Sequence, residues 1–475
     1  MHGRGWFKLP RKSSEVSPIT SSQMVTMERL TVFARYPTPG FAKTRLIPAL
    51  GAEGAAKLQC RLTEHVLKTA DEMQAVRRID VEVRFTGSAQ LEMQDRFGSI
   101  NTSFVPQCEG DLGSRLHHAA KAAFDAGIKK VVIMGTDCPD IDAKYLIQAF
   151  DALNQSDIVL GPAFDGGYTL IGLKAPHPEL FSGIEWGTNN VLSTTLDQCK
   201  AMKRKVYLLG PYSDVDHPED LIVCRRHSVV FDDVLATTAP GLISIVIPTL
   251  NESAYLEDTL TPIVGLAKDA IEIIVADGGS TDGTLAIATR MGVRVVSAAK
   301  GRGRQMNAGA ALASGEVILF LHADTRLPPD FVDQVWQVMS KQVVAGAFRL
   351  RIAGASLAFR MVEWGTNVRS RVRKIPYGDQ AIFVRAKDFY RLGGFRHWPL
   401  MEDYEFCHRV RSQGGLAIAC AEVTTSSRRW QRLGTLRTTL RNQCCILAYH
   451  CGISIERIAA IYSNGLQESG RTSHV

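Results

Sequence analysis

The chain has 475 residues, which is too long for one ordinary hydrophobic core and predicts two or three domains. Apolar residues make up 45% of it and charged residues 22%, as in ordinary soluble globular proteins. The net charge of +7 suits an anionic small molecule or peripheral contact with a membrane surface, and it is too small to indicate a nucleic-acid partner.

The cysteines and the apolar runs exclude further classes of protein. The ten cysteines are scattered and form no CxxC pair, which argues against a zinc site or a thioredoxin-type site. Lone thiols are typical of a reducing compartment, so we expect a cytoplasmic protein. No apolar run reaches the roughly 18 residues that span a bilayer. Residues 1–28 are basic and Ser-rich without an apolar centre, which predicts a disordered lead and not a signal peptide.

Residues 29–225 alternate between strand-like and helix-like segments. Apolar runs predict strands at 31–36, 81–85, 131–137, 157–163 and 206–210. Between them, helical patterns cover 51–73 and 114–127. This alternation predicts an α/β domain with a mostly parallel, Rossmann-like sheet. In such a sheet, ligands bind at the carboxyl ends of the strands.

The segment FARYPTPGFAKTRL follows the first predicted strand and carries Gly40, Lys43 and Arg45. It is not a Walker A motif, because the GxxxxGK[ST] spacing is absent. Backbone N–H groups together with two cations nevertheless suit a diphosphate. We therefore predict that these three residues bind a nucleotide, with a solvated loop as the alternative.

Acidic residues follow two other predicted strands of this half. Asp137 ends the run VVIMGTD, and Asp216 lies in DVDHPEDL. Carboxylates on two strand-end turns are suitable ligands for a hard divalent cation, so we predict that this pair binds Mg²⁺ or Mn²⁺. Asp165 and Gly166, in GPAFDGGYTLIGL, are predicted to face a sugar or an acceptor.

These motifs, taken in order, carry a resemblance. Residues 29–225 resemble a family of uncharacterised GT-A-type transferases, related to the guanylyltransferases of molybdenum-cofactor synthesis and to sugar-nucleotide pyrophosphorylases. The usual final motif of that family reads D-x-D-T-P-E-D, and His217 replaces its Thr. The resemblance implies a bound nucleotide and leaves three alternatives open: nucleotidyl transfer, glycosyl transfer, or a non-catalytic nucleotide-binding scaffold.

Residues 226–241 have no clear period and end in Pro-Gly, which predicts a linker. From residue 242 the strand–helix pattern starts again, and we expect 242–475 to form a second α/β domain with a C-terminal helical tail. Its predicted strands are 243–250, 272–279, 293–300 and 317–324. The helical segment 437–452 combines Arg residues with an apolar face, so it can dock on the domain or lie on a membrane interface.

Acids at separate strand ends of the second half predict a nucleotide and metal site. Asp277 can accept hydrogen bonds from a base or a ribose, and Asp324 can bind a divalent cation beside diphosphate oxygens. Asp403, which follows Glu402, can take a proton from an acceptor hydroxyl as general base. For Asp277, Asp324 and Asp403 the alternative is a structural role at the start of a helix.

The segment KGRGRQMNAG follows the third strand of this half. Its glycines, together with Arg302 and Arg304, suit an anion near a helix N-terminus. The basic run RSRVRK, residues 369–374, is interpreted as a solvated face, with phosphate binding as the alternative.

The ordered set IPTLNE, VADGGSTDGT, GRGRQMNAGA, FLHADT, GDQ and MEDYEF resembles the inverting glycosyltransferases of family 2, which have the GT-A fold. The resemblance implies that Asp324 is the second acid of a DxD-type metal motif, with His322 at the first position, as a ligand or as a nearby donor. The residues implied in nucleotide binding are Asn251, Glu252, Asp277, Arg302 and Arg304. Those implied in substrate binding are Asp379, Gln380, Arg429 and Trp430.

More narrowly, GRGRQMNAGA, LHADT and SSRRWQRLGT resemble a bacterial subfamily associated with arsenosugar biosynthesis. Together the motifs predict two tandem GT-A-like domains that act in one pathway. The second would be a metal-dependent inverting glycosyltransferase that moves a sugar from a nucleotide-sugar donor to a small-molecule or lipid-linked hydroxyl acceptor. We expect no nucleic-acid partner and at most peripheral membrane contact, and the sequence does not indicate an oligomeric state.

Overall fold

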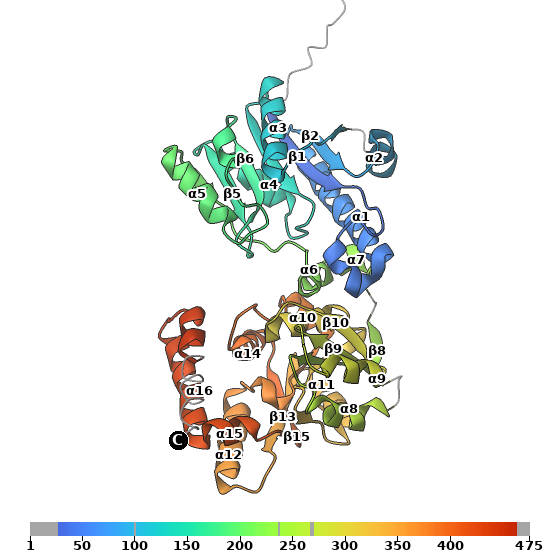
Figure 1. Ribbon diagram of the computed structural model, residues 1–475, viewed down its shortest axis with the longest axis vertical. Coiled ribbons are helices and arrows are strands. Elements are labelled where there is room, and N and C mark those ends of the chain that lie inside the picture. Colours follow the sequence, from blue (N-terminus) through green and yellow to red (C-terminus); the bar gives the residue numbers. More distant parts are fainter. Residues whose placement is uncertain (1–26, 99–100, 236–237, 267–269, 463–475) are drawn as a thin grey trace, which may run out of the picture.

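The computed structural model describes residues 27–98, 101–235, 238–266 and 270–462. Two α/β halves lie one above the other, with the short helices α6 (Leu221–Arg226) and α7 (Ser228–Phe231) at their junction (Figure 1). Most of the predicted disordered lead falls outside the described residues, and Glu28 already belongs to the first strand.

The first half is built on a seven-stranded sheet with the order β3-β2-β1-β4-β6-β5-β7. Its strands are β1 (Glu28–Arg35), β2 (Asp80–Thr86), β3 (Thr102–Pro106), β4 (Lys130–Gly135), β5 (Ile158–Pro162), β6 (Tyr168–Leu173) and β7 (Val206–Leu208). Only β6 runs antiparallel to its neighbours β4 and β5. The helices are α1 (Ile47–Gln74), α2 (Gln90–Phe97), α3 (Leu112–Asp125), α4 (Ala143–Ala152) and α5 (Val191–Ala201).

The second half has an eight-stranded sheet with the order β10-β9-β8-β11-β14-β13-β15-β12. Its strands are β8 (Ala239–Thr249), β9 (Ile271–Asp277), β10 (Arg294–Ser297), β11 (Gly315–Phe320), β12 (Thr325–Arg326), β13 (Ala345–Ile352), β14 (Phe383–Arg385) and β15 (Leu416–Thr425). Its helices are α8 (Leu256–Val264), α9 (Thr284–Arg290), α10 (Arg302–Ala311), α11 (Phe331–Met339), α12 (Leu357–Arg373), α13 (Ala386–Arg391), α14 (Glu402–Gln413), α15 (Arg428–Leu433) and α16 (Thr435–His450).

The two sheets share one plan. In each, a parallel set of four strands is followed by one antiparallel strand, β6 in the first sheet and β14 in the second. The tip of β4 leads to Asp137, and the tip of β11 leads to Asp324. The predicted fold class, two tandem GT-A-like α/β units with mostly parallel sheets, is confirmed.

Burial on both faces explains why the central strands are continuous apolar runs. The residues Val131–Met134 of β4 and Val317–Phe320 of β11 are all buried. Parallel strands covered by helices on both sides have no solvent face, so they do not alternate between polar and apolar residues. In these two strands the polar residues therefore lie outside the buried runs, and the candidate sites lie at the carboxyl ends.

The junction between the halves is well packed. One apolar cluster combines Leu46, directly before α1, and Leu58 of α1 with Met306 of α10 and Phe389 of α13. The buried Arg225 donates to the carbonyl oxygens of Ala311, at 2.8 and 2.9 Å, and of Ala313, at 3.0 Å. The predicted linker, 226–241, thus contains α7 and the start of β8, and the domain limits at residues 225 and 242 stay a prediction.

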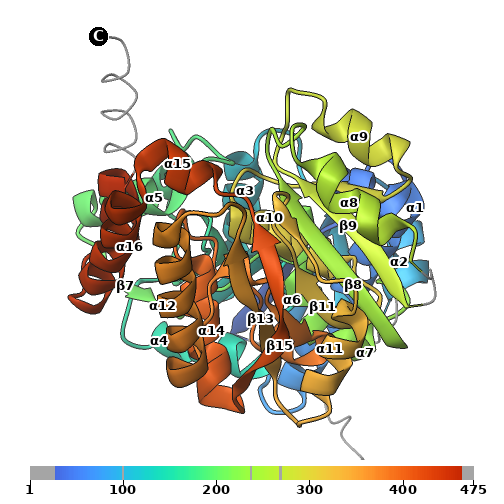
Figure 2. The same cartoon turned by 90° about the horizontal axis from the view of Figure 1, so that it is seen from below.

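Three helices, α12, α15 and α16, form the side of the second half that is farthest from β8 and β9 (Figure 2). Helix α12 packs against β13, and α16 packs beside both α12 and α15. None of the helices in the described parts of the chain combines the length and the apolar character that crossing a bilayer requires.

Candidate functional sites

A cavity of about 540 Å³ lies at the carboxyl edge of the first sheet. Five of the predicted residues line it: Lys43, Arg45, Asp137, Asp165 and Asp216. They come from the turn after β1, the tip of β4, the β5–β6 turn and the segment after β7. The strand order thus gathers side chains that are up to 173 positions apart in sequence.

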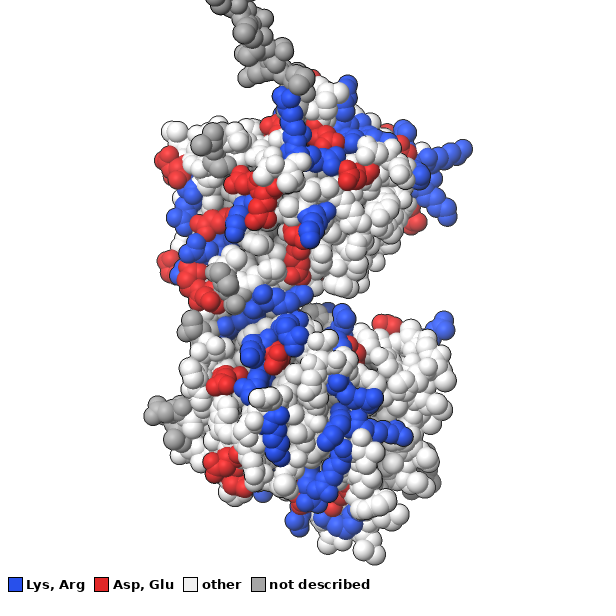
Figure 3. Space-filling view, turned by 180° about the vertical axis from the view of Figure 1, so that it is seen from behind, with Lys and Arg blue, Asp and Glu red and all other residues white. Residues whose placement is uncertain are grey.

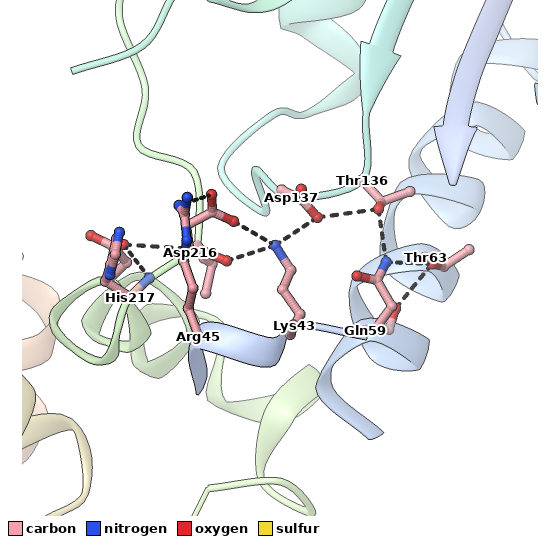
Figure 4. Close-up of polar contacts among 10 residues, drawn as sticks. Lys43, Arg45, Gln59, Thr63, Thr136, Asp137, Asp216 and His217 are labelled. Carbon is pink, nitrogen blue, oxygen red and sulfur yellow. Dashed lines mark hydrogen bonds and ion pairs between the residues drawn. The ribbon is translucent and has the colours of Figure 1, made fainter. Parts of the chain in front are cut away.

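Lys43 is the centre of this cavity's polar network (Figure 4). Its Nζ lies 2.8 Å from Asp137 Oδ1 and 3.0 Å from Asp216 Oδ1, and it donates to the Val215 carbonyl oxygen at 2.7 Å. The side chain is only 6% exposed. The two carboxylates that were predicted to share a metal ion therefore share the ammonium group of a lysine.

Burial and charge act against each other in this network. Burial opposes the charge on Lys43, but Asp137 and Asp216 outweigh it and raise the pKa of the lysine above its ordinary value. Burial likewise opposes the charge on Asp216, and Lys43 outweighs it, so the pKa of Asp216 is lowered. Asp214 has no such cation beside it, and burial with the charges of neighbouring acids raises its pKa to about 7.

A chain of hydrogen bonds positions Asp137 from the side of α1. Gln59 Nε2 donates to Thr136 Oγ1 at 3.0 Å, and Thr136 Oγ1 donates to Asp137 Oδ1 at 3.4 Å (Figure 4). Gln59 and Thr136 are both buried. The carboxylate is thereby held between Thr136 and Lys43.

The two glycines that were predicted to bind ligands do not line the cavity. Gly40 has a φ of 82° and lies in the turn before Lys43, where only its backbone conformation matters. Gly166 has a φ of 94°, and a Cβ there would lie 2.1 Å from the Asn189 carbonyl oxygen. Asp165, beside it, accepts a hydrogen bond from Gly167 N at 2.8 Å. Gly166 is thus required by close packing of the backbone.

The sequence interpretation missed several residues of this cavity: Arg35, Gln107, Arg115, Trp186 and Asp214. Within the described structure, Arg115 Nε and Trp186 Nε1 are buried and have no hydrogen-bond partner. Asp214 is the first acid of the DVDHPEDL motif, so the motif itself was a signal for it. Arg115 and Trp186 lie in the motifs QCEGDLGSRL and EWGTNNVL, to which the sequence interpretation assigned no role.

A second cavity, of about 210 Å³, lies at the carboxyl edge of the second sheet. Seven predicted residues line it: Arg302, His322, Asp324, Asp379, Asp403, Arg429 and Trp430. They are supplied by the first residue of α10, the turn after β11, the short helix η4 (Gly378–Gln380), and the helices α14 and α15. On its far side the cavity is closed by Asn442, Cys445 and Ile446 of α16.

Arg428 connects two acids at this edge. Its Nε lies 2.9 Å from Asp324 Oδ2, and its two terminal nitrogens each donate to a carboxylate oxygen of Glu252 at 2.8 Å. Burial raises the pKa of Asp324, with Arg428 opposing that effect. The sequence interpretation named Arg429 and missed Arg428, although the run SSRRW contains both.

Asp403 stands at the start of α14 with both carboxylate oxygens engaged. Oδ2 accepts from Gly378 N at 2.6 Å, and Oδ1 accepts from its neighbour Tyr404 N at 2.7 Å. A Cβ on Gly378 would lie 2.9 Å from His322 Nε2 and 3.1 Å from Asp403 Oδ2. The glycine of YGDQ is therefore what lets His322 and Asp403 approach the same point.

Burial shifts the pKa values of two further groups of this cavity toward their neutral forms. Burial, with Arg302 and Arg429 adding to it, lowers the pKa of His322 well below its ordinary value. Burial raises the pKa of Asp379 to about 6, although Arg369 opposes it. Asp379 Oδ1 is also buried without a hydrogen-bond partner in the described structure.

Other predicted residues support the loops and do not line the cavity. Asp277 is buried and accepts from Gly279 N and Ser280 N, each at 2.9 Å. Asn251 Oδ1 accepts from Thr281 N at 2.9 Å, which ties the loop after β8 to the loop after β9. Nucleotide binding by Asp277 and Asn251 stays a prediction, and their observed contacts organise these two loops.

Three more predicted residues are not part of the cavity lining. Gln380 is fully buried and is hydrogen-bonded to Ser370 Oγ and to the Phe348 carbonyl oxygen. Glu402 is buried with its carboxylate 3.5 Å from Arg302 Nη1. Arg304 points to the junction, 3.8 Å from the buried Glu219 of the first half. A direct role in binding or catalysis is an untested prediction for all three.

The donors at each edge suit a divalent cation that is held by few protein ligands. In the described residues no three His, Cys, Asp or Glu side chains converge as a metal cage. Mg²⁺ and Mn²⁺ in nucleotide sites often take one or two protein ligands and complete their shell with diphosphate oxygens and water. Asp324 with neutral His322, and Asp137 with Asp216, are such donor pairs.

Comparison with known proteins agrees with the two halves. Residues 244–394 match the family described as "Glycosyl transferase family 2", and residues 69–188 match "Uncharacterized protein conserved in bacteria (DUF2064)". A solved structure, a putative nucleotide-diphospho-sugar transferase from Desulfovibrio desulfuricans, is 33% identical and covers 43% of this chain and 88% of that one, with a TM-score of 0.39.

Three curated relatives add detail. An uncharacterized glycosyltransferase of Nostoc is 31% identical over 111 residues, which is 22% of this chain and 34% of that protein. A phosphoenolpyruvate guanylyltransferase of Chloroflexus aggregans is 28% identical over 159 residues, 33% of this chain and 77% of that protein. The PGL/p-HBAD biosynthesis glycosyltransferase of Mycobacterium bovis is 30% identical over 213 residues, 42% of this chain and 81% of that protein. Through its second half, the chain belongs to glycosyltransferase family 2 and is a glycosyltransferase.

Proposed function

We propose that the second half transfers a glycosyl group from a nucleotide-sugar donor to a hydroxyl acceptor, with inversion at the anomeric carbon. The observation that carries this proposal is the composition of the 210 Å³ cavity. Arg302, Arg428 and Arg429 line this cavity together with Asp403. Cations for a diphosphate and a base for a hydroxyl are the two elements that this reaction requires.

In this reaction the acceptor oxygen attacks the anomeric carbon while the bond to the diphosphate oxygen breaks. Asp403 takes the proton of the acceptor hydroxyl, and a nucleoside diphosphate leaves. Gly378 N and Tyr404 N donate hydrogen bonds to Asp403 and fix the orientation of its carboxylate. The three arginines stabilise the negative charge of the leaving diphosphate.

Asp324 and His322 are the residues that would hold a divalent cation, Mg²⁺ or Mn²⁺. When bound, this ion supplies further neutralisation of the leaving diphosphate. Arg428 would then keep Glu252 as its partner, because its two terminal nitrogens already bind that carboxylate. His322 is suited to ligation because the buried imidazole is neutral.

For the first half we propose nucleotidyl transfer to a phosphorylated sugar or alcohol, the product of which the second half would use as donor. The support is a cavity lined by Arg35, Lys43, Arg45 and Arg115, large enough for a nucleotide, together with the likeness to a guanylyltransferase. A relation to the molybdenum-cofactor guanylyltransferases belongs to the same proposal. The alternative is a scaffold that binds a nucleotide without reaction.

The narrower assignment to arsenosugar biosynthesis is a proposal about the acceptor, and it rests on the motifs GRGRQMNAGA, LHADT and SSRRWQRLGT. A small arsenic-containing alcohol and a lipid-linked alcohol both present the hydroxyl group that Asp403 requires. A trial of both acceptor types with one donor would separate them.

The test uses the full chain with a panel of nucleotide sugars and Mn²⁺, followed by release of nucleoside diphosphate. Asp403→Asn should lower turnover by roughly 10²–10⁴-fold, because a general base contributes about that much. Its melting temperature should fall only slightly, since the amide oxygen can still accept from Gly378 N and only the hydrogen bond from Tyr404 N is lost. Unchanged turnover in this variant would refute the role of Asp403.

The first half has a separate readout. Transfer of a nucleotidyl group from a nucleoside triphosphate to a sugar phosphate releases pyrophosphate, whereas glycosyl transfer releases a nucleoside diphosphate. Asp403→Asn should leave pyrophosphate release unchanged. If no combination of triphosphate and sugar phosphate releases pyrophosphate, nucleotidyl transfer is wrong for this half and the scaffold alternative remains.

A further inference from the structure

Helix α12 is polar where it is buried. Its buried side chains are Phe359 and the polar Glu363, Asn367 and Ser370. Glu363 Oε1 accepts from Ile352 N at 2.6 Å, and Asn367 bonds both Leu350 N, at 2.8 Å, and the Leu350 carbonyl oxygen, at 3.0 Å. Strand β14 pairs with β13 at Ala345 and Gly346. The backbone groups of β13 at Leu350 and Ile352 find hydrogen-bond partners on the side chains of α12.

The outward face of the same helix is apolar. Five large side chains, 41% to 82% exposed, follow one another at intervals of three or four residues along it: Leu357, Met361, Trp364, Val368 and Val372. Such intervals place them in one row on the helix. An ordinary surface helix buries its apolar row and exposes its polar one. In α12 the polar row is buried and the apolar row is exposed. Contiguous exposed apolar surface of this kind marks an interaction site.

Helix α16, which packs beside α12, carries a second row. Leu436, Leu440, Cys444 and Leu447 are exposed and lie at intervals of three or four residues. The opposite side of α16 closes the 210 Å³ cavity. This helix is therefore shared between the cavity wall and the outer surface of the protein.

The charges on these helices are nearly all positive. Residues 357–374 contain five basic residues and one acid, Glu363, which pairs with Arg360 at 2.8 Å. Residues 428–450 contain no acid and five arginines, of which Arg428 and Arg429 line the 210 Å³ cavity while Arg432 and Arg437 are exposed. Figure 3, seen from behind, shows Lys and Arg side chains on the lower half of the molecule together with fewer Asp and Glu side chains and with wide uncharged areas. A partner that covers the outward sides of α12 and α16 must accept both apolar and cationic groups.

We propose that α12 and α16 form a docking surface for an anionic phospholipid bilayer, with both helices lying in the interface plane. The apolar rows would enter the boundary between headgroups and acyl chains, and the basic residues would contact lipid phosphates. Trp364 suits the boundary between headgroups and acyl chains, because indole rings favour the membrane–water interface. A second copy of the chain fits less well, since it would bring two rows of like charge together.

This proposal does not depend on the proposed reaction, so binding can be measured without turnover. The full chain is mixed with vesicles of phosphatidylcholine, or of phosphatidylcholine and phosphatidylglycerol in equal parts, and vesicle-bound protein is recovered by flotation. The protein should float with the anionic vesicles, and added salt should weaken its binding.

Two variants address the two components of the surface. Met361→Ser with Trp364→Ser should weaken binding roughly tenfold or more, because both side chains leave water in the bound state. Arg371→Gln with Arg373→Gln should weaken it roughly 30-fold, since each basic residue near an anionic surface contributes about one kcal/mol. Leu91→Ser is the matched control, because Leu91 is 71% exposed on α2 in the other half.

Circular dichroism and the melting temperature should be unchanged in all these variants, because the substituted side chains are exposed. The proposal is overturned if the unsubstituted protein floats with neither vesicle type. The same holds if the Met361→Ser, Trp364→Ser variant binds vesicles to the same extent as the Leu91→Ser control. It is also overturned if sedimentation shows a dimer that the serine variant dissociates while vesicles have no effect, since a second copy would then be the occupant.

Discussion

At the residue scale, each candidate site has a basic side chain directly on its strand-tip acid. Lys43 lies between Asp137 and Asp216 in the first half, and Arg428 contacts Asp324 in the second. Acids that are brought together in a partly buried place repel one another unless a cation joins them. The basic residue is therefore part of the structural reason why these acids can gather.

Lys43→Met should destabilise the protein by about 1–3 kcal/mol, because it leaves two carboxylates facing each other without their cation; the loss is below that of a fully buried pair since both acids are partly exposed. Urea unfolding measures it. Mg²⁺ or Mn²⁺ should raise the melting temperature of this variant more than that of the unsubstituted protein, because the ion replaces the ammonium group. Equal shifts in the two proteins would argue against a metal site here.

Asp214 should make stability depend on pH in a direction opposite to that of a salt-bridged acid. Its folded-state pKa of about 7 lies above that of an unfolded aspartate, so the folded state binds the extra proton. Its contribution to stability is therefore greatest below about pH 4 and is lost as the pH rises to about 7. The free energy of unfolding of Asp214→Asn should not fall in this way between about pH 4 and about pH 7. If the difference in unfolding free energy between the variant and the unsubstituted protein is the same at every pH, the pKa of Asp214 is not shifted.

At the element scale, the apolar runs predicted most of the parallel strands, because a strand covered on both faces has an unbroken apolar sequence. The antiparallel strand β6 was missed because it lies inside GPAFDGGYTLIGL, which was interpreted as a ligand-binding motif, and the three-residue strand β14 was not predicted. Asp403 and Asp324 were identified because motifs surround them. The inner position of Gln380 and the contact of Arg428 depend on neighbours distant in sequence, and no local pattern records such neighbours.

Helix α10 packs so closely on β8 that its own Gly309 is required. A Cβ at this position would lie 2.4 Å from Val246 Cγ1. Gly309→Ala should therefore destabilise the protein by about 1–3 kcal/mol, as overpacking does. Gly365→Ala in α12 is the matched control, because nothing lies within 4 Å of its Cβ position. That control should stabilise the protein by about 0.5–1 kcal/mol in the same urea experiment.

At the scale of the whole molecule, the two halves share one apolar cluster across the junction, and Arg225 of the first half donates into the second. Two units joined by a packed, hydrogen-bonded junction are expected to unfold as one. Experiments on this protein are therefore better done on the full chain with site variants than on separated halves.

Arg225→Ala should weaken this coupling. The substitution removes three hydrogen bonds to the Ala311 and Ala313 carbonyl oxygens and a guanidinium that lies 5.2 Å from the centroid of the Tyr390 ring. We expect a loss of about 2–5 kcal/mol and, in calorimetry, two transitions in place of one. Arg226→Ala, a change at a half-exposed neighbour, is the control, and a single transition in both variants would show that Arg225 does not couple the halves.

The lysine between Asp137 and Asp216 has a consequence for the life of the protein in a cell. The strand-tip acids of the first half already have a permanent counter-ion that the chain itself supplies. The first half can therefore fold without Mg²⁺ or Mn²⁺. On the proposed metal role, a shortage of magnesium or manganese would lower the activity of the protein and leave the amount of folded protein unchanged.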